Sequence, residues 1–485
     1  MKLLGLSGKH VRFVFLGWLI VSFLGVNLFA PNSANALTLS DEKKIGKEAL
    51  EMIKARMPLV EDGEVLTYVQ SVGNRLVKQL GNTPYDFQFF VINEPVPNAF
   101  AVPGGYIFIY RGLIEMMTSE GELAGILGHE LGHIQAHHYQ RQMEDSHMLN
   151  LATIAGVIAA ALIGAKTGGG AGAQALMMGS MAGAQTAQLK YSRENEEEAD
   201  QRGLQYLCAA GYPAKDMVTV MQRLNQAQWM ANSNIPSYLL THPALTERIQ
   251  YLQDLSQKPE YRNQPANAGA LGDFPIMQAS LVAEYSDPHA AEDRFRLAAR
   301  KGDVAATYGL GRLYLRQGKV AEALPYLQEA ARQDSRSPFV LSTLGDAYLK
   351  EGKLNEAQRV LQTALFLDPS SPVVHYRLAL VLKDLGQKEE ALQHLQRIEQ
   401  WAPAFPDIDS NMGTLLGQMD QMGLAHFYLG RYYLHQHNWD TAVFHFRKAR
   451  PLIFDSPQKL EELDQGLKEA EKHIKEKSLR GMRRQ

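Results

Sequence analysis

Residues Leu127–Ile134 read LGHELGHI. Two histidines stand four residues apart, with a glutamate directly after the first and apolar residues on either side. Ser119 followed by Glu122 is a capping-box signature, so we expect a helix to begin just before the motif. On that helix His129 and His133 would lie one turn apart on the same face, where both imidazoles could reach one ion.

Zinc suits this pair of histidines. It accepts neutral imidazole nitrogens, takes a carboxylate as a third protein ligand and leaves a fourth position for water. Glu130 would lie beside such an ion, where it could act as the general base for that water. Because H-E-x-x-H also arises by chance in long chains, a zinc site needs a further ligand from elsewhere in the sequence.

A second acidic motif, YSRENEEEAD at residues 191–200, offers that ligand. A run of charges is usually the solvated face of a helix, but the spacing favours Glu196. Glu196 shares a helical face with Gly203 and Leu207, which is small and apolar enough to pack against the first helix. Asp200, one turn on, could accept the N–H of a metal-bound histidine and fix its tautomer.

Two stretches before the motif helix are short and rich in aromatic and β-branched residues: YDFQFFVI at 85–92 and GGYIFIY at 104–110. They predict strands of a small sheet. We expect a strand from Ala101 to Ile109 to border the cleft as an edge strand. An extended substrate could add there by main-chain hydrogen bonds along Ala101, Val102 and Tyr106. A purely structural strand is the alternative.

The segment at 149–190, between the two motifs, consists of two apolar runs rich in glycine and alanine, broken by three glycines at 168–170. The first run is too short and too rich in small residues to indicate a membrane-spanning helix. We expect a helical hairpin packed on the core of the protein. A flap, or a hairpin that faces a membrane or a partner, is the alternative.

Beyond about residue 287 the sequence repeats with a period of 34 residues. Gly311, Gly345 and Ala379 mark three copies in register, and a fourth copy at Gly430 follows an insertion. This is the period and residue pattern of tetratricopeptide repeats, whose helix pairs stack into a superhelix with an extended concave groove.

The N-terminus carries the pattern of a secretory signal peptide. Basic residues up to Arg12 precede an uncharged run at 13–30 and an A-x-A sequence at 34–36. We predict cleavage after Ala36, and an uncleaved membrane anchor is the alternative.

The single cysteine, Cys208, cannot form an internal disulfide, and its apolar neighbours predict a buried and inert thiol;.

The chain has 485 residues and a formal net charge of -3. This length predicts two or three domains, and the charge gives no general attraction to nucleic acid, so we expect no nucleic-acid partner. The predicted fold is mostly α: an α+β catalytic domain with a small sheet and zincin-type helices, then an α-solenoid. The predicted segments are a signal peptide (1–36), a metallopeptidase domain (37–262), a linker (263–286), the repeats (287–455), and a polar C-terminal helix and tail (456–485).

HELGH followed by EEEAD, with NAFAVPGGYIFIYRGLI upstream and THPALTERI downstream, resembles peptidase family M48, whose pattern is H-E-x-x-H and then E-x-x-x-D. The resemblance implies that His129, His133 and Glu196 bind one Zn²⁺ per chain. It also implies that Glu130 is the catalytic base and that Asp200 supports a ligand.

An exported member of this family with C-terminal repeats implies a periplasmic endopeptidase. The resemblance further implies that it degrades unfolded or misassembled outer-membrane β-barrel proteins and assists their assembly. The repeats would then contact the β-barrel assembly machinery, and peripheral association with the membrane is compatible with this role. A rival hypothesis is a repeat-based chaperone or scaffold for outer-membrane protein assembly with a latent zinc site. A complete ligand set beside Glu130 argues against a purely structural zinc, because structural sites rarely keep an open position.

If the fold matches, His242 in THPALTERI lies near the site. We hypothesise that it approaches the zinc as a regulatory ligand or stabilises the tetrahedral intermediate, and an ordinary turn histidine is the alternative. Arg248 would anchor that loop through a charge-assisted hydrogen bond. His137 and His138 continue the first helix, so we expect them at the surface. Because the linker is short, we also expect the repeats to pack against the catalytic domain and to control access to it.

Overall fold

The computed structural model describes residues 38–145, 191–230, 238, 242–262, 273–401, 405, 407–454 and 456–482. The predicted signal peptide with its cleavage after Ala36 and the predicted hairpin at 149–190 lie outside these residues. Among the residues described, we find no helix that combines the length and the apolar composition of a membrane span.

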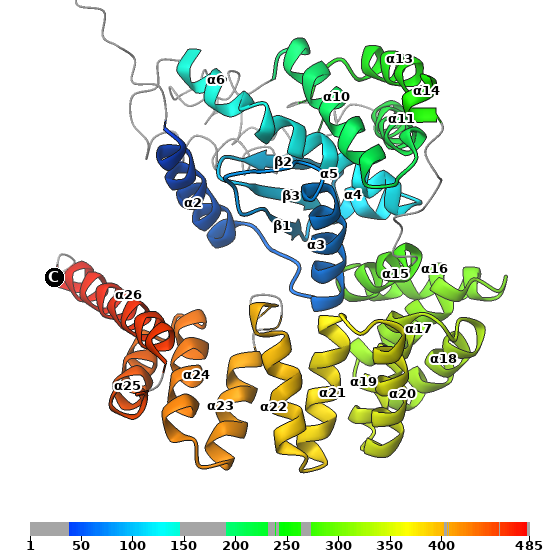
Figure 1. The fold of residues 1–485 in the computed structure, drawn as a ribbon. Coiled ribbons are helices and arrows are strands. Elements are labelled where there is room, and N and C mark those ends of the chain that lie inside the picture. Colours follow the sequence, from blue (N-terminus) through cyan, green and yellow to red (C-terminus); the bar gives the residue numbers. More distant parts are fainter. Residues whose placement is uncertain are drawn as a thin grey trace, which may run out of the picture.

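A three-stranded sheet lies at the centre of the described N-terminal half, residues 38–262, in the order β1-β3-β2 (Figure 1). β1 (Gln88–Ile92) pairs in parallel with β3 (Tyr106–Tyr110), and β2 (Ala99–Val102) pairs with β3 in antiparallel fashion. The strand predicted from residue 101 to 109 is therefore two strands, because the glycine pair 104–105, with φ of 86° and 96°, reverses the chain;. Of these two strands, β2 lies at an edge of the sheet and β3 is central.

The two faces of the sheet are covered by different helices. α2 (Leu39–Arg56) packs on one face, where the rings of Phe100 and Phe108 stack at 4.9 Å. α3 (Gly63–Val77) and α5 (Glu120–Gln135) pack on the other face. The sheet thus holds α5, the helix that carries HELGH, from one side.

The predicted start of α5 is confirmed. The hydroxyl of Ser119 accepts a hydrogen bond from the backbone N–H of Glu122 at 3.2 Å. The carboxylate of Glu122 accepts instead from the backbone N–H and the hydroxyl of Thr118. The remaining helices of the N-terminal half are α4 (Arg111–Met116), α6 (His138–Asp145), α10 (Arg193–Ala209), α11 (Ala214–Met230), α13 (Leu245–Ser256) and α14 (Pro259–Arg262).

Part of the predicted linker at 263–286 is instead a helix, α15 (Phe274–Tyr285). Its residues are apolar on most sides, and they are buried between α3 and α4 of the N-terminal half and α17 (Val304–Arg316) of the repeats. A linker would leave this apolar surface in water, which is why the segment folds and packs.

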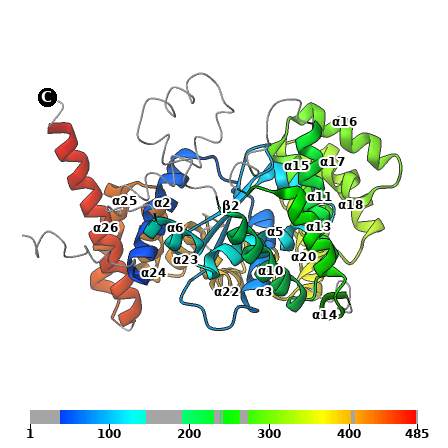
Figure 2. The ribbon, with the colours of Figure 1, turned by 90° about the horizontal axis from the view of Figure 1, so that it is seen from above.

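The repeats form the predicted α-solenoid, which runs beneath the N-terminal half from α15 at one end to the C-terminal helix at the other (Figures 1 and 2). The helices that follow α15 are α16 (Pro288–Ala299), α17, α18 (Val320–Gln333), α19 (Pro338–Lys350), α20 (Leu354–Leu367), α21 (Pro372–Asp384), α22 (Lys388–Arg397), α23 (Ile408–Gln418), α24 (Met422–His435), α25 (Trp439–Ala449) and α26 (Pro457–Met482). The insertion before the fourth copy contains α23, which packs against α24.

The two halves are in direct contact through the start of α3, as expected. Glu64 is buried there and accepts hydrogen bonds from Arg377 of α21, from the Thr343 hydroxyl at 3.0 Å and from the Tyr308 hydroxyl at 3.1 Å. Burial raises the pKa of Glu64, but the positive charges of Arg377 and Arg312 hold it below its ordinary value. The buried carboxylate is therefore charged where the two halves meet.

Apolar contacts continue across the same interface. The Tyr68 ring of α3 packs against Phe274 of α15 at 6.3 Å and against Phe339 of α19 at 5.8 Å between ring centres. Tyr68 also donates a hydrogen bond to Glu120, at the start of α5. The core below α5 therefore extends into the first helices of the array.

Candidate metal centre

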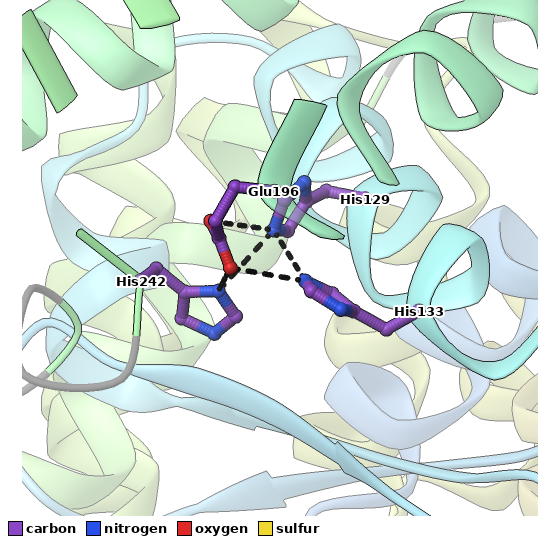
Figure 3. A group of neighbouring side chains, drawn as sticks. All are labelled: His129, His133, Glu196 and His242. Carbon is purple, nitrogen blue, oxygen red and sulfur yellow. Dashed lines mark hydrogen bonds and ion pairs between the residues drawn. The ribbon is translucent and has the colours of Figure 1, made fainter. Parts of the chain in front are cut away.

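Four side chains from three parts of the N-terminal half converge on one point (Figure 3). His129 and His133 come from α5, Glu196 comes from α10, and His242 comes from the turn before α13. One nitrogen or oxygen of each lies within 4.8 Å of those of the others, and all four side chains are buried. The structure thus brings together the predicted ligands and His242.

The separations suit a small metal ion. Nε2 of His133 is 3.0 Å from Nε2 of His129, and the Glu196 carboxylate oxygens lie 3.5 and 3.7 Å from these two nitrogens. Ligand atoms about 2.0–2.2 Å from a tetrahedral zinc ion stand roughly 3.3–3.6 Å apart. Two imidazoles and a carboxylate are also the donor set that zinc prefers.

Glycine allows α5 and α10 to approach closely enough for this. A Cβ on Gly203 of α10 would lie 2.8 Å from the backbone nitrogen of His129, and one on Gly132 of α5 would lie 2.5 Å from the carbonyl oxygen of Ala199. Any larger residue at either place would separate the helices and with them the ligands on each side.

Asp200 and Arg248 support the ligands from behind. Oδ1 of Asp200 lies 2.8 Å from Nδ1 of His129, as predicted. Arg248 donates to both oxygens of Asp200 at 2.7 Å, and its Nη1 donates to Glu196. Burial raises the pKa values of Glu196 and Asp200, but the charge of Arg248 keeps both below their ordinary values. Arg248 thus anchors its loop as predicted and also orients a candidate ligand.

Glu130 lies beside the cluster and is completely buried. Neither oxygen of its carboxylate has a hydrogen-bond partner among the described residues, and its Oε1 is 3.6 Å from Nε2 of His242. Burial raises the pKa of Glu130. A buried carboxylate without a partner is costly, so it is retained at such places for function and not for stability.

Residues 65–256 match the model of peptidase family M48. This part of the chain is an M48 peptidase domain. Residues 276–338, 314–374 and 348–419 match models of the tetratricopeptide repeat.

The M48 domain and its repeats are similar to curated relatives. One in Vibrio cholerae is 30% identical over 320 residues, which are 64% of each chain. The beta-barrel assembly-enhancing protease of Escherichia coli is 28% identical over 256 residues, which are 53% of this chain and 51% of the relative. The similarity thus spans about half to two thirds of these relatives. A tetratricopeptide-repeat protein of Thermus thermophilus, of known structure, is 21% identical with a TM-score of 0.26, covering 40% of this chain and 97% of that one.

His242 is an integral part of the M48 domain's buried cluster, in contrast to an ordinary turn histidine. Its Nδ1 lies 3.0 Å from Oε1 of Glu196 and 3.3 Å from Nε2 of His129, and the Tyr238 ring stacks on it at 4.5 Å. Burial lowers the pKa of His242, but Glu196 and Glu130 raise it above its ordinary value. The distances of its Nδ1 from Glu196 and His129 place His242 where a fourth metal ligand would be.

The surface position expected for His137 is confirmed, whereas that expected for His138 is wrong. His138 is completely buried with Nδ1 2.8 Å from Nδ1 of His133, whereas the His137 side chain is 47% exposed. The helix does not continue past Gln135, because His137 adopts a left-handed φ of 52° and α6 starts afresh at His138. Helical periodicity alone therefore misplaces His138.

The predicted substrate-binding residues lie on two faces of the sheet. Ala101 belongs to the core shared with α5, whereas Val102 and Tyr106 pack in the core shared with α2. Tyr106 is on the central strand β3, and Ala101 and Val102 are on the edge strand β2. Their role in binding a substrate stays a prediction.

Cys208 is buried as expected, and burial raises its pKa to about 11, so the thiol is inert;.

Proposed function

We propose that the chain is a zinc-dependent endopeptidase of the periplasm that degrades misassembled outer-membrane β-barrel proteins and assists their assembly. The observation that supports this most strongly is the position of Glu130. A buried carboxylate that has no hydrogen-bond partner among the described residues lies beside two histidines and a glutamate whose spacing suits one metal ion. A structural zinc site would have no use for such a group.

In this proposal His129, His133 and Glu196 hold one Zn²⁺ per chain, and Asp200 fixes the tautomer of His129. When bound, zinc polarises a carbonyl and makes water a better nucleophile. Glu130 takes the proton of the attacking water and delivers it to the departing amine.

His242 acts as a regulatory ligand in the arrangement described here. Its Nδ1 faces the ligand atoms, where a substrate carbonyl or a water would otherwise bind. The loop that carries it must then move before a peptide can be cut. The other hypothesis is that His242 stabilises the tetrahedral intermediate.

The substrate class is proposed from the names of the relatives and from the fold. Relatives are named beta-barrel assembly-enhancing proteases. The outer edge of β2, which pairs with no other strand in the described part of the chain, would bind an extended chain mainly through its backbone. This suits an enzyme that meets unfolded proteins of varied sequence. The repeats would contact the assembly machinery through their concave surface. The proposal also includes export of the chain to the periplasm, with cleavage of the signal peptide after Ala36.

The decisive experiment is degradation of an unfolded outer-membrane protein by the purified chain from Leu37 onward, compared with Glu130→Gln. Glutamine has the same size, and no partner within the described residues is lost, so the variant should fold and retain zinc. We expect wild-type protein to cut the substrate and Glu130→Gln to be slower by about 10²- to 10⁴-fold. If both proteins bind zinc and substrate and neither cuts, the scaffold with a latent site is the better hypothesis.

A further inference from the structure

His138 contacts His133 from the side away from the other ligand atoms. Its Nδ1 is 2.8 Å from Nδ1 of His133, and its Nε2 is 3.2 Å from Oε2 of Glu198. His133 meanwhile turns its Nε2 toward His129 and Glu196. Glu198, His138 and His133 thus form a continuous row of polar contacts that ends at the candidate metal centre.

The break between α5 and α6 is what places His138 there. On a continuous helix a residue five positions after His133 would point roughly 140° away from it. The left-handed conformation of His137 ends α5 and turns the chain back, so that the first residue of α6 meets His133. Such a conformation costs a non-glycine residue about 1–2 kcal/mol, so its presence calls for a compensating role.

The hydrogen-bond pattern then allows a single arrangement of protons. If His133 offers the lone pair of Nε2 to a metal, its Nδ1 must carry the hydrogen and donate. Nδ1 of His138 must accept that hydrogen, so His138 carries its own on Nε2 and donates it to Glu198. Both rings stay neutral, and each contact has one donor and one acceptor.

Glu198 is itself held in place as an acceptor. Arg141 of α6 donates to its Oε2 at 2.8 Å, and Arg202 of α10 donates to its Oε1 at 2.9 Å. Its side chain is 33% exposed. The row therefore starts at a carboxylate fixed between two arginines, and it ties α6 to α10.

We propose that His138 is a positioning residue that, together with Glu198, fixes the orientation and tautomer of His133, as Asp200 does for His129. The inference deepens the proposed zinc site and rests on it. Each histidine ligand would then be supported at Nδ1: His129 by a carboxylate directly, and His133 by a carboxylate acting through a second imidazole. Support of this kind typically changes metal affinity by about 10- to 100-fold.

The test is the zinc dissociation constant of the whole chain from Leu37 onward, measured by competition with a fluorescent chelator. His138→Phe keeps an aromatic ring but removes the acceptor, so we expect zinc to bind about 10- to 100-fold more weakly. His138→Asn should lose less, because its carbonyl oxygen can still accept from Nδ1 of His133. Glu198→Gln, an isosteric change at a partly exposed side chain, should give a smaller loss in the same direction. His137→Asn is the matched control and should bind zinc as the wild type does, because asparagine tolerates the left-handed conformation.

The midpoint of unfolding of the metal-free proteins separates positioning from packing. A purely structural role would lower this midpoint for both His138 variants and leave the zinc affinity of the folded protein unchanged. The inference is overturned if the folded His138 variants bind zinc within threefold of the wild type, or if Asn loses as much affinity as Phe. If Phe does not fold, Asn and Glu198→Gln decide. If the wild type itself binds no zinc, the proposed zinc site is contradicted, and with it the positioning role of His138.

Discussion

A single guanidinium, that of Arg248, connects two acidic residues that act differently on the site. It donates to both oxygens of Asp200 and to Glu196 while being almost completely buried. Removal of one partner from a buried ion pair leaves a charge without compensation, which costs about 3–5 kcal/mol. Two such charges share this one partner.

We therefore expect Arg248→Leu to destabilise the protein by several kcal/mol and to weaken zinc binding by at least about tenfold. Denaturant unfolding and chelator competition measure the two effects. Arg193→Leu is the matched control: Arg193 pairs with Glu247 between the same two helices, but the two side chains are 72% and 64% exposed. An exposed pair contributes about 0–1 kcal/mol, so equal effects of the two substitutions would contradict the account.

His242→Ala distinguishes the two roles proposed for that residue. If His242 is a regulatory ligand, the variant should cut an unfolded substrate faster than the wild type, because the position facing Glu196 is vacated. If it stabilises the intermediate, the variant should be slower by about 10²-fold at similar zinc content. Initial rates with matched zinc content decide, and an unchanged rate would exclude both roles.

Among the residues of the candidate metal centre, the sequence predicted those whose side chains share a face of one helix. It missed the neighbouring histidine that follows a break between two helices. His129 and His133, and then Glu196 and Asp200, follow from spacing along α5 and α10. His138 was misplaced because one backbone angle, at His137, redirects the chain. Histidine is among the residues enriched in left-handed conformations, but the enrichment is too small to predict such a break.

Two repeats carry a pair of histidines at the same place in their helices. His375 of α21 and His394 of α22 are in contact through Nδ1 atoms 2.7 Å apart, and His426 and His445 are likewise 2.9 Å apart in α24 and α25. The second repeat has Leu341 and Val360 at the equivalent positions. The histidine pairs therefore replace an apolar contact between the helices of a repeat.

Such a pair should make the array sensitive to acid. Burial lowers the pKa of His394 to about 4, with His375 acting in the same direction, whereas a histidine in the unfolded chain titrates at about 6.5;. Between these values only the unfolded chain binds the proton, so the pair's contribution is complete above pH 6.5 and falls as the pH drops toward 4.

The variant His375→Leu with His394→Val copies the second repeat. We expect its unfolding midpoint in denaturant to fall less than that of the wild type between pH 7 and pH 4.5, because two titrating groups are gone. The comparison is made on zinc-free protein, so that pH-dependent zinc binding does not contribute, and the metal-site residues are the same in both proteins. Parallel pH profiles for the two proteins would contradict the prediction.

At the scale of elements, the repeats could be predicted because the sequence repeats every 34 residues. The helix α15 could not be predicted in this way. Its helix lies outside the repeat period, and the loop-forming residues just before it extended the predicted linker too far. The β2–β3 hairpin was merged into one strand because only the conformation of its glycine pair divides it. Both errors concern chain reversals and contacts between distant segments.

At the level of the whole molecule, Glu64 links the N-terminal half to the repeats. Replacement by Gln removes the charge that Arg377 and Arg312 face in a buried interface, so we expect a loss of about 3–5 kcal/mol;. Unfolding midpoints and hydrogen exchange of α3 and α21 measure the loss. Glu61→Gln is the control, because that side chain is exposed three residues earlier. An effect of similar size in the control would show that the buried charges do not hold the halves together.

The contact of Tyr68 with Phe274 and Phe339 bears on how such a protein can arise by gene fusion. Recombination that joined an intact peptidase to an existing repeat array would bring together two surfaces that had each been soluble alone. Here the ring beneath the HELGH helix is covered by residues that belong to the array. A peptidase half transplanted without α15 and α19 would expose that ring to water, so we infer that the two halves can be exchanged between proteins only together with these helices.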